Sequence, residues 1–172
     1  MSVSSVLSPY QIKSMIEGVI TKELTINHDN RGLLMEFLRD DDEFYQKFGQ
    51  AYMTLVKKGI AKGWHYHKKQ DDHFVCVEGK ALVALYDMRE DSPTYKQSQD
   101  FILSAPELDG EHLLVKIPKG VVHGFTAVDC DQAKIVNIPT EHYDYDEPDE
   151  FRYEWNSPEI DYQWPDYVKG GG

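Results

Sequence analysis

Short runs of apolar residues alternate with turn residues through most of the chain. Strand-like runs begin at Val19 (VITKELTI) and Leu33 (LLMEFLR), and others follow between residues 49 and 138. Apolar residues spaced two apart, bounded by Gly, Pro, Asn and Asp, are typical of β-strands. Many short strands at close spacing with almost no helix predict a β-sandwich or a barrel.

Turn residues predict how some of these strands are joined. The runs FVCV and ALVALYDM flank Glu78-Gly79-Lys80, which predicts a β-hairpin with a tight glycine turn. The residues from Asn27 to Asn30, with Gly32, predict a turn before LLMEFLR. The polar turn Asp129-Cys130-Asp131 is predicted to separate the strands GVVHGFTAV and AKIVNIP.

The two ends of the chain have a different character. Ser8 and Pro9 match the N-cap and first position of a short amphipathic helix that ends at Gly18, so residues 1–17 are predicted to form a helical extension. The acidic stretch DDDEFYQKF has room for one helical turn. Residues 140–172 are acidic and rich in aromatic residues, which favours an ordered tail wrapped over the barrel. We expect a single domain over residues 1–172.

Charge and cysteine content narrow the function classes. The net charge is 18 − 30 = −12, which argues against binding of nucleic acid through neutralised phosphates. No stretch approaches the roughly 18 apolar residues of a membrane span, and the N-terminus lacks the apolar core of a signal peptide. Cys76 and Cys130 form no metal-binding or disulfide pattern, so a reducing cytoplasm is the expected location.

The candidate chemistry lies in two segments. Residues 62–79 contain His65, His67 and Asp72, and residues 117–125 supply His123. Because residues two apart in a strand face the same side, His65 and His67 are expected to share one face. We expect the two segments to be neighbouring strands whose polar side chains meet at the mouth of a small barrel.

The spacing of these residues resembles the two motifs of the cupin superfamily. The first reads HxH, four residues, Asp, six residues, Gly, with Asp72 where glutamate is usual, and the second reads PxGxxH. This resemblance implies a mainly β cupin fold, a double-stranded β-helix or jelly-roll barrel, with short peripheral helices. It also implies an alternative in which His65, His67, Asp72 and His123 bind one divalent metal, namely Fe, Mn, Ni or Zn.

Five segments resemble the dTDP-4-dehydrorhamnose 3,5-epimerase family more closely. They are residues 29–36 (DNRGLLME), 63–67 (GWHYH), 87–95 (DMREDSPTY), 117–125 (IPKGVVHGF) and 153–165 (YEWNSPEIDYQWP). The family resemblance implies a homodimer without a metal cofactor that acts on a nucleotide-linked 4-keto-6-deoxy sugar. A base removes a proton beside the C4 ketone, and an acid on the opposite face returns one.

The resemblance also assigns roles to individual residues. His65 matches the base, and Tyr143 stands at the position of the acid, with Tyr145 as its competitor. The positions that match or replace substrate-binding residues are Arg31, Glu36, Gln50, Lys62, His67, Asp72 and His123. Arg31 has a purely structural alternative, which is an ion pair with Asp29 in a turn.

One departure from the family pattern is important for the mechanism. Asp72 replaces a lysine that stabilises the enolate, and a carboxylate in its place would repel that anion. Lys68, Lys69 and His73 are candidates to replace the lysine. Three functions therefore stay open: a nucleotide-sugar epimerase, a metal-dependent cupin enzyme, and a nucleotide-sugar-binding cupin without turnover.

Overall fold

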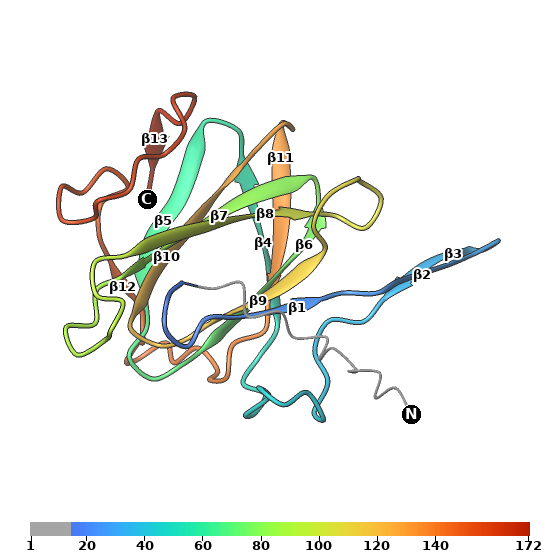
Figure 1. Ribbon diagram of the computed structural model, residues 1–172, viewed down its shortest axis with the longest axis horizontal. Helices are drawn as coiled ribbons and strands as arrows, with labels where there is room; N and C mark the ends of the chain where they lie inside the picture. Colours follow the sequence, from blue (N-terminus) through green and yellow to red (C-terminus); the bar gives the residue numbers. More distant parts are fainter. Residues whose placement is uncertain (1–14) are drawn as a thin grey trace, which may run out of the picture.

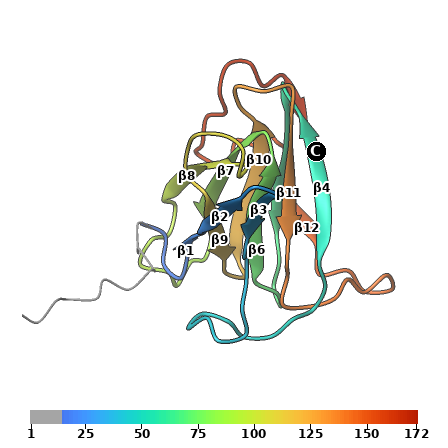
Figure 2. The same ribbon diagram turned by 90° about the vertical axis from the view of Figure 1, so that its right-hand side faces the viewer.

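Two antiparallel β-sheets pack face to face to form a jelly-roll barrel, as the resemblance to the cupin superfamily implies. The computed structural model describes residues 15–172 (Figures 1 and 2). The five-stranded sheet has the order β1 (Ile20–Glu23), β9 (Leu113–Ile117), β6 (Asp72–Glu78), β11 (Gln132–Asn137) and β4 (Tyr52–Lys57). The second sheet has the order β12 (Phe151–Arg152), β5 (Ile60–Tyr66), β10 (Val121–Ala127), β7 (Lys80–Asp87) and β8 (Ser98–Ser104), with β13 (Gly170–Gly171) paired in parallel to β5.

The main core lies between the two sheets and follows the alternation along each strand. In β6, Phe74 and Cys76 face the interior, and in β10, Val121 and Phe125 do so. Full burial of a large apolar side chain contributes about 1.5–3 kcal/mol each. Asp72 and His123 precede Phe74 and Phe125 by two residues, so they face the same interior at the end of the barrel.

The predicted hairpin at Gly79 is wrong, because β6 and β7 belong to different sheets. Gly79 has a φ of +70°, and a Cβ on it would lie 2.4 Å from the Gln132 carbonyl oxygen. The turn thus carries the chain from one sheet to the other, and the turn at Asp129-Cys130-Asp131 does the same between β10 and β11. A tight glycine turn looks alike in sequence whether it joins paired strands or crosses between sheets.

Other local predictions need smaller corrections. The hairpin of β2 (Ile26–Asp29) and β3 (Gly32–Met35) turns at Asn30-Arg31, so the predicted turn residues 27–29 are part of β2. No helix occurs within residues 15–172, so the expected short peripheral helices are not found there, and most of the predicted helix from Ser8 falls outside the described residues. The acidic stretch forms turns that are closed by backbone hydrogen bonds from Asp42 to Arg39 and from Tyr45 to Asp42.

The segment from residue 140 onward runs along the outer side of β5. β12 and β13 both pair with β5, and Trp64 faces this segment rather than the core. The Trp64 indole lies 4.7 Å from that of Trp164, and its Nε1 donates to the Trp155 carbonyl at 3.1 Å. The outward residues of β5 are therefore covered by the C-terminal segment, while its inward residues face the barrel interior.

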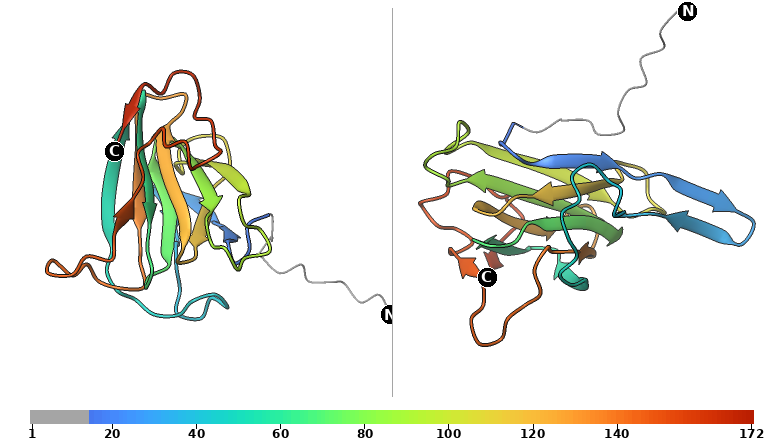
Figure 3. Two further views of the ribbon diagram at one scale, coloured as in Figure 1. Left: turned by 90° about the vertical axis from the view of Figure 1, so that its left-hand side faces the viewer. Right: turned by 90° about the horizontal axis from the view of Figure 1, so that it is seen from below.

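The β2–β3 hairpin projects beyond the barrel (Figures 1 and 3). Its turn residue Arg31 is highly exposed, and its guanidinium pairs with Asp29 at 2.6 Å. Leu33 and Leu34 on β3 are also exposed. This hairpin therefore carries apolar side chains that this chain by itself leaves uncovered.

A close approach between β5 and β10 positions two of the candidate histidines. His123 is paired with His65 and Phe125 with Lys62, so the register shifts by one residue between them. This irregularity lets Lys62 and His65, which are three residues apart, both face the interior. Gly63 lies opposite Gly124, and a Cβ on Gly63 would lie 2.7 Å from the Gly124 Cα.

We expect Gly63→Ala to destabilise the protein by about 2 kcal/mol or more, because the added methyl group forces β5 away from β10. Urea unfolding measures this loss as a lower midpoint. Gly170→Ala is the matched control, because a Cβ there would meet the Ile60 Cδ1 at an ordinary 3.6 Å. Equal losses in the two variants would contradict the packing argument.

Candidate functional site

A cavity of about 710 Å³ opens at one end of the barrel. Its walls come from both sheets, through inward residues of β4, β5, β6 and β10, and from the C-terminal segment between Glu141 and Arg152. Phe74 and Phe125 lie beneath the polar residues, with ring centroids 5.7 Å apart. The cavity therefore has an apolar floor and a polar mouth, which suits a ligand with both kinds of surface.

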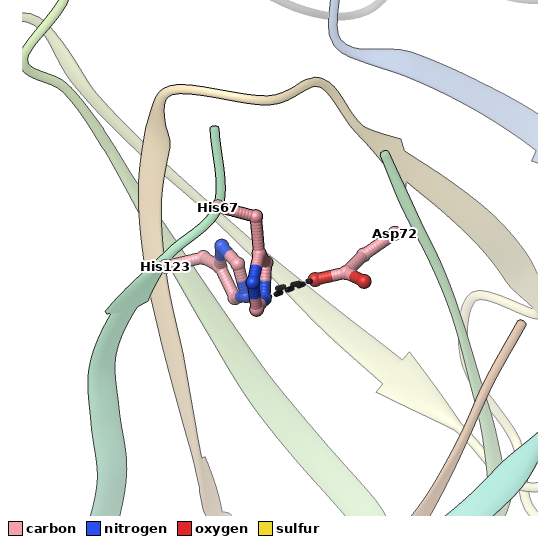
Figure 4. A group of neighbouring side chains, drawn as sticks. All are labelled: His67, Asp72 and His123. Atoms are coloured by element: carbon pink, nitrogen blue, oxygen red, sulfur yellow. Dashed lines mark ion pairs between the residues drawn. The ribbon is translucent and has the colours of Figure 1, made fainter. Parts of the chain in front are cut away.

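A buried carboxylate organises the polar part of this cavity. Asp72 is 1% exposed. Its Oδ2 accepts from His67 Nε2 at 3.2 Å and from His123 Nε2 at 3.1 Å (Figure 4). Its Oδ1 accepts from Gln70 Nε2 and Asn137 Nδ2, both at 2.9 Å. Four donors thus satisfy both carboxylate oxygens, as a buried ionised carboxylate requires.

These contacts determine the charge of Asp72. Burial by itself raises the pKa of the Asp72 carboxyl, but the hydrogen bonds from His123 and His67 outweigh that effect and hold the pKa well below its usual range. Asp72 is therefore ionised at any pH at which the protein functions.

His67 is held between two acceptors. Its Nδ1 faces the Asp149 carbonyl oxygen, and its Nε2 faces the Asp72 carboxylate. Because neither acceptor can donate, both ring nitrogens carry a hydrogen, which is the imidazolium form. Burial lowers the pKa of His67, but the hydrogen bond to Asp72 and the charge of Asp72 prevail, so the pKa is raised.

His65 lies in the opposite electrostatic situation. Its Nε2 is buried and has no hydrogen-bond partner within residues 15–172. Burial lowers the pKa of His65 to about 3, and positive charge on His123, Arg152 and their neighbours acts in the same direction. His65 is therefore neutral near pH 7, and its ring presents an unused lone pair.

The cavity brings together most of the predicted site residues. The predicted site residues that line it are His65, Tyr143, Gln50, Lys62, His67, Asp72 and His123. Lys62 Nζ donates to Thr54 Oγ1 at 2.6 Å, and the Tyr143 backbone N–H donates to Gln50 Oε1 at 3.2 Å. Tyr143 is 39% exposed, whereas its competitor Tyr145 is 89% exposed, and the two rings make an edge contact at 5.0 Å.

Two predicted residues are not among those that line the cavity. Arg31 pairs with Asp29, the structural alternative for this residue, and Glu36 pairs with Arg39 at 3.5 Å. Arg31 belongs to the β2–β3 hairpin, and Glu36 belongs to the segment just after it. Within a single chain they lie outside the site.

Three of the four residues in the metal alternative come together. Single ligand atoms of His67, Asp72 and His123 all lie within 4.8 Å of one another, but His65 is not part of that group. A divalent cation at this position would take the place of the hydrogen bonds that His67 and His123 donate to Asp72. His67 and His123 could bind such an ion only as neutral imidazoles.

The candidates to replace the family's lysine differ in position. Lys69 lines the cavity. The ammonium group of Lys68 lies 4.1 Å from the ring centroid of Phe151. His73 points to the other side of β6, where its ring stacks on Phe44. Of these three, only Lys69 is placed to meet a ligand.

The sequence analysis missed several residues of the cavity wall. Tyr52 and Thr54 alternate with Gln50 onto the cavity, so the period-two rule applied to β4 would have found them. No period-two pattern pointed to Asn137 or Asp149, because β11 contains no other candidate residue and Asp149 lies outside the strands. Asp149 also accepts the backbone N–H groups of residues 68–70 and so fixes the loop after His67.

Comparison with known proteins agrees with the fold and identifies a family. A family model described as dTDP-4-dehydrorhamnose 3,5-epimerase matches residues 13–170. The spore coat polysaccharide biosynthesis protein SpsL of Bacillus subtilis is 37% identical over 150 residues, which cover 87% of this chain and 97% of SpsL. The probable low-salt glycan biosynthesis epimerase Agl13 of Haloferax volcanii is 36% identical, over 90% of this chain and 98% of its own length.

A solved structure is similar throughout the barrel. The crystal structure of a dTDP sugar isomerase from Desulfovibrio desulfuricans superposes with a TM-score of 0.79 at 28% sequence identity. The match covers 87% of this chain and 92% of that one. Residues 15–172 of the present chain contain no helix that is long and apolar enough to cross a membrane.

We expect the pKa values of His65 and His67 to be shifted in opposite directions from the ordinary value of a histidine. His65, with a pKa of about 3, stays neutral as the pH falls from 7.5 to about 4.5, while His67 keeps its proton above its ordinary pKa of 6.5. Long-range proton–nitrogen NMR correlation of the imidazole rings measures both charge states. A neutral His67 at pH 6 would contradict the hydrogen-bond assignment.

The same shift has a consequence for stability. Below pH 6.5 the unfolded chain binds a proton at residue 65, and the folded chain does not do so until about pH 3. The free energy of unfolding that depends on a neutral His65 is therefore fully present above pH 6.5. It falls as the pH is lowered from there toward 3.

Proposed function

The chain belongs to the dTDP-4-dehydrorhamnose 3,5-epimerase family, and from that premise we propose that it epimerises a dTDP-4-keto-6-deoxyhexose by removing a proton beside the C4 ketone. The observation that carries this proposal is His65, a neutral imidazole whose side chain lines the cavity. The chain is an isomerase rather than a metal-dependent enzyme of another class.

His65 has the properties of the base in this reaction. The unprotonated ring nitrogen of His65 takes the proton from C3 or C5, and the electron pair of the broken C–H bond moves into an enolate whose charge rests on the C4 oxygen. The unpaired lone pair needs no prior loss of a proton, because burial keeps His65 neutral. The proton on His65 then passes to solvent, which resets the base.

Tyr143 is the proposed acid on the opposite face of the sugar. A phenol is still protonated at neutral pH and can deliver its proton to carbon. The bond from the Tyr143 backbone to Gln50 anchors this part of the C-terminal segment at the rim of the cavity. The greater exposure of Tyr145 favours Tyr143 over its competitor.

Cations at the rim supply binding for the diphosphate. Lys62, Lys69 and Arg152 line the cavity together with several carboxylates. Lys62 uses one of its three N–H groups on Thr54, which leaves two for a phosphate oxygen. Because the wall is also acidic, additional positive charge from outside this chain would strengthen binding.

A homodimer would supply that charge. The β2–β3 hairpin projects from the barrel (Figure 3). It carries the exposed Arg31 at its turn and the exposed Leu33 and Leu34 on β3. An apolar surface on an extended hairpin favours docking on a second copy of the chain. We assign Arg31 and Glu36 to nucleotide-sugar binding in the partner's cavity.

The reaction as proposed uses protein groups alone. Asp72 already accepts four hydrogen bonds, so a metal ion would have to displace two protonated donors, of which His67 has a raised pKa. His65, the proposed base, lies outside the group that could bind a metal.

We expect the protein to incorporate deuterium at C3 or C5 of a dTDP-4-keto-6-deoxyhexose in deuterated water, as measured by NMR. His65→Asn should lower the exchange rate about 1,000-fold, because it removes the base. His112→Asn is the matched control, since that half-buried ring does not line the cavity and faces the Leu108 carbonyl. Exchange should survive dialysis against a chelator.

Failure of the wild-type protein to exchange any nucleotide-linked keto sugar would refute the epimerase proposal. Tight dTDP binding without exchange would instead indicate a binding protein. Loss of exchange with the chelator, restored by a divalent ion, would favour the metal-dependent mechanism.

The dimer predicts complementation between two defective variants. Arg31→Ala lacks the residue supplied to the partner, and His65→Asn lacks the base. A mixture that is refolded together should regain exchange activity, because each mixed dimer contains one intact site. No recovery, or a monomer by light scattering, would contradict the shared site.

A further inference from the structure

Tyr52 begins strand β4, and its side chain lines the cavity beside Gln50 and Thr54. It comes from the five-stranded sheet, whereas His65 comes from the six-stranded sheet, so the two residues face the cavity from different walls. We propose that the Tyr52 hydroxyl donates the hydrogen bond that stabilises the enolate oxygen. This inference rests on the epimerase function proposed above.

The hydrogen bonds of Asn137 determine how the Tyr52 hydroxyl is used. The Asn137 Oδ1 accepts from the His73 backbone N–H at 2.9 Å, which identifies the oxygen of the amide. Its Nδ2 must then be the donor to both Asp72 Oδ1 at 2.9 Å and Tyr52 Oη at 3.0 Å. The amide of Asn137 is therefore fully used and cannot rotate.

Tyr52 Oη is thus an acceptor toward Asn137, and its own hydrogen remains to be donated. No second partner of Tyr52 Oη occurs among the residues that the structure describes. A phenol that accepts one hydrogen bond becomes a better donor along its own O–H bond. The hydroxyl is consequently held in place before any ligand arrives, with its hydrogen available to an oxygen in the cavity.

The charge state of the phenol suits a hydrogen-bond donor better than an acid. Tyr52 is 43% exposed as a whole residue, but desolvation of its phenol and the nearby negative charge of Asp72 raise the pKa of Tyr52 to about 12. The phenol stays protonated throughout the working range and releases its proton reluctantly. Tyr52 is therefore suited to stabilise an oxyanion, whereas the proton that returns to carbon comes from Tyr143.

The other donors near Asp72 are already occupied. His67 points one ring nitrogen at Asp149 and the other at Asp72, and His123 points its two at the Val121 carbonyl and Asp72. Neither imidazole has an N–H left for a ligand. With aspartate at the family's lysine position, a fixed neutral donor such as Tyr52 supplies the stabilisation that the lysine would otherwise give.

The test compares two tyrosine variants in two assays. Deuterium incorporation measures enolate formation, and the amount of epimer measures proton return on the opposite face. Tyr52→Phe should lower both rates together by about 100-fold or more, as expected for loss of one oxyanion donor. Tyr143→Phe should lower epimer formation while exchange continues.

Two controls separate this role from a structural one. Tyr52→Phe should keep the wild-type dTDP affinity by calorimetry and lower the melting temperature only slightly, because Asn137 Nδ2 loses its bond to Tyr52 Oη but keeps its bond to Asp72. Tyr95→Phe removes an exposed phenol outside the cavity and should change neither rate.

Three outcomes would overturn the inference. Exchange by Tyr52→Phe within about threefold of the wild-type rate would show that the hydroxyl is not needed. Retained exchange with lost epimer formation would make Tyr52 the proton donor. A fall in rate that accompanies a large fall in melting temperature, or an equal fold-loss of dTDP affinity, would make its role structural. Absence of exchange in the wild-type protein would refute the proposed function itself.

Discussion

The interaction on which this structure depends is the burial of one ionised carboxylate, Asp72, at the mouth of the barrel. Its four donors come from three places: His67 and Gln70 in the connection between β5 and β6, His123 in β10, and Asn137 in β11. His123 and Asn137 belong to different sheets, so the hydrogen bonds of the carboxylate link the two sheets beside the cavity. Leaving such a charge without its partners costs about 3–5 kcal/mol, which makes the arrangement of these side chains highly specific.

The same carboxylate separates the charges of two histidines that lie two residues apart. It holds the proton on His67, while burial keeps the proton off His65. Neighbouring titratable groups with opposite shifts are typical of sites where one group must be a base and another must stay charged. The aspartate at the position of the family's lysine does not face the ligand as a bare charge, because its oxygens are covered by donors.

A short segment that resembles the family can serve the fold as well as the chemistry. The segment DMREDSPTY matches the family, yet its buried Asp87 accepts hydrogen bonds from Arg89, Ser92 and Thr94 at the end of β7. Arg89 also donates to the Glu17 carbonyl, and Thr94 accepts from the Glu17 backbone. This segment therefore secures the chain before β1, whereas the segment with His123 contributes directly to the cavity.

The sequence by itself determined where most strands lie and, within a regular strand, which side each residue faces, because both follow from a local period of two. The shift in β5 that turns Lys62 and His65 to the same side lies outside that rule. That rule placed His65 and His67 on one face and would have added Tyr52 and Thr54 to Gln50. Only the tertiary structure decided that the turn at Gly79 crosses between sheets, that His65 stays apart from the Asp72 cluster, and that Arg31 lies outside the cavity. Asn137 lies 65 residues from Asp72, and no local pattern predicts a contact that arises from the pairing of β11 with β6 within one sheet.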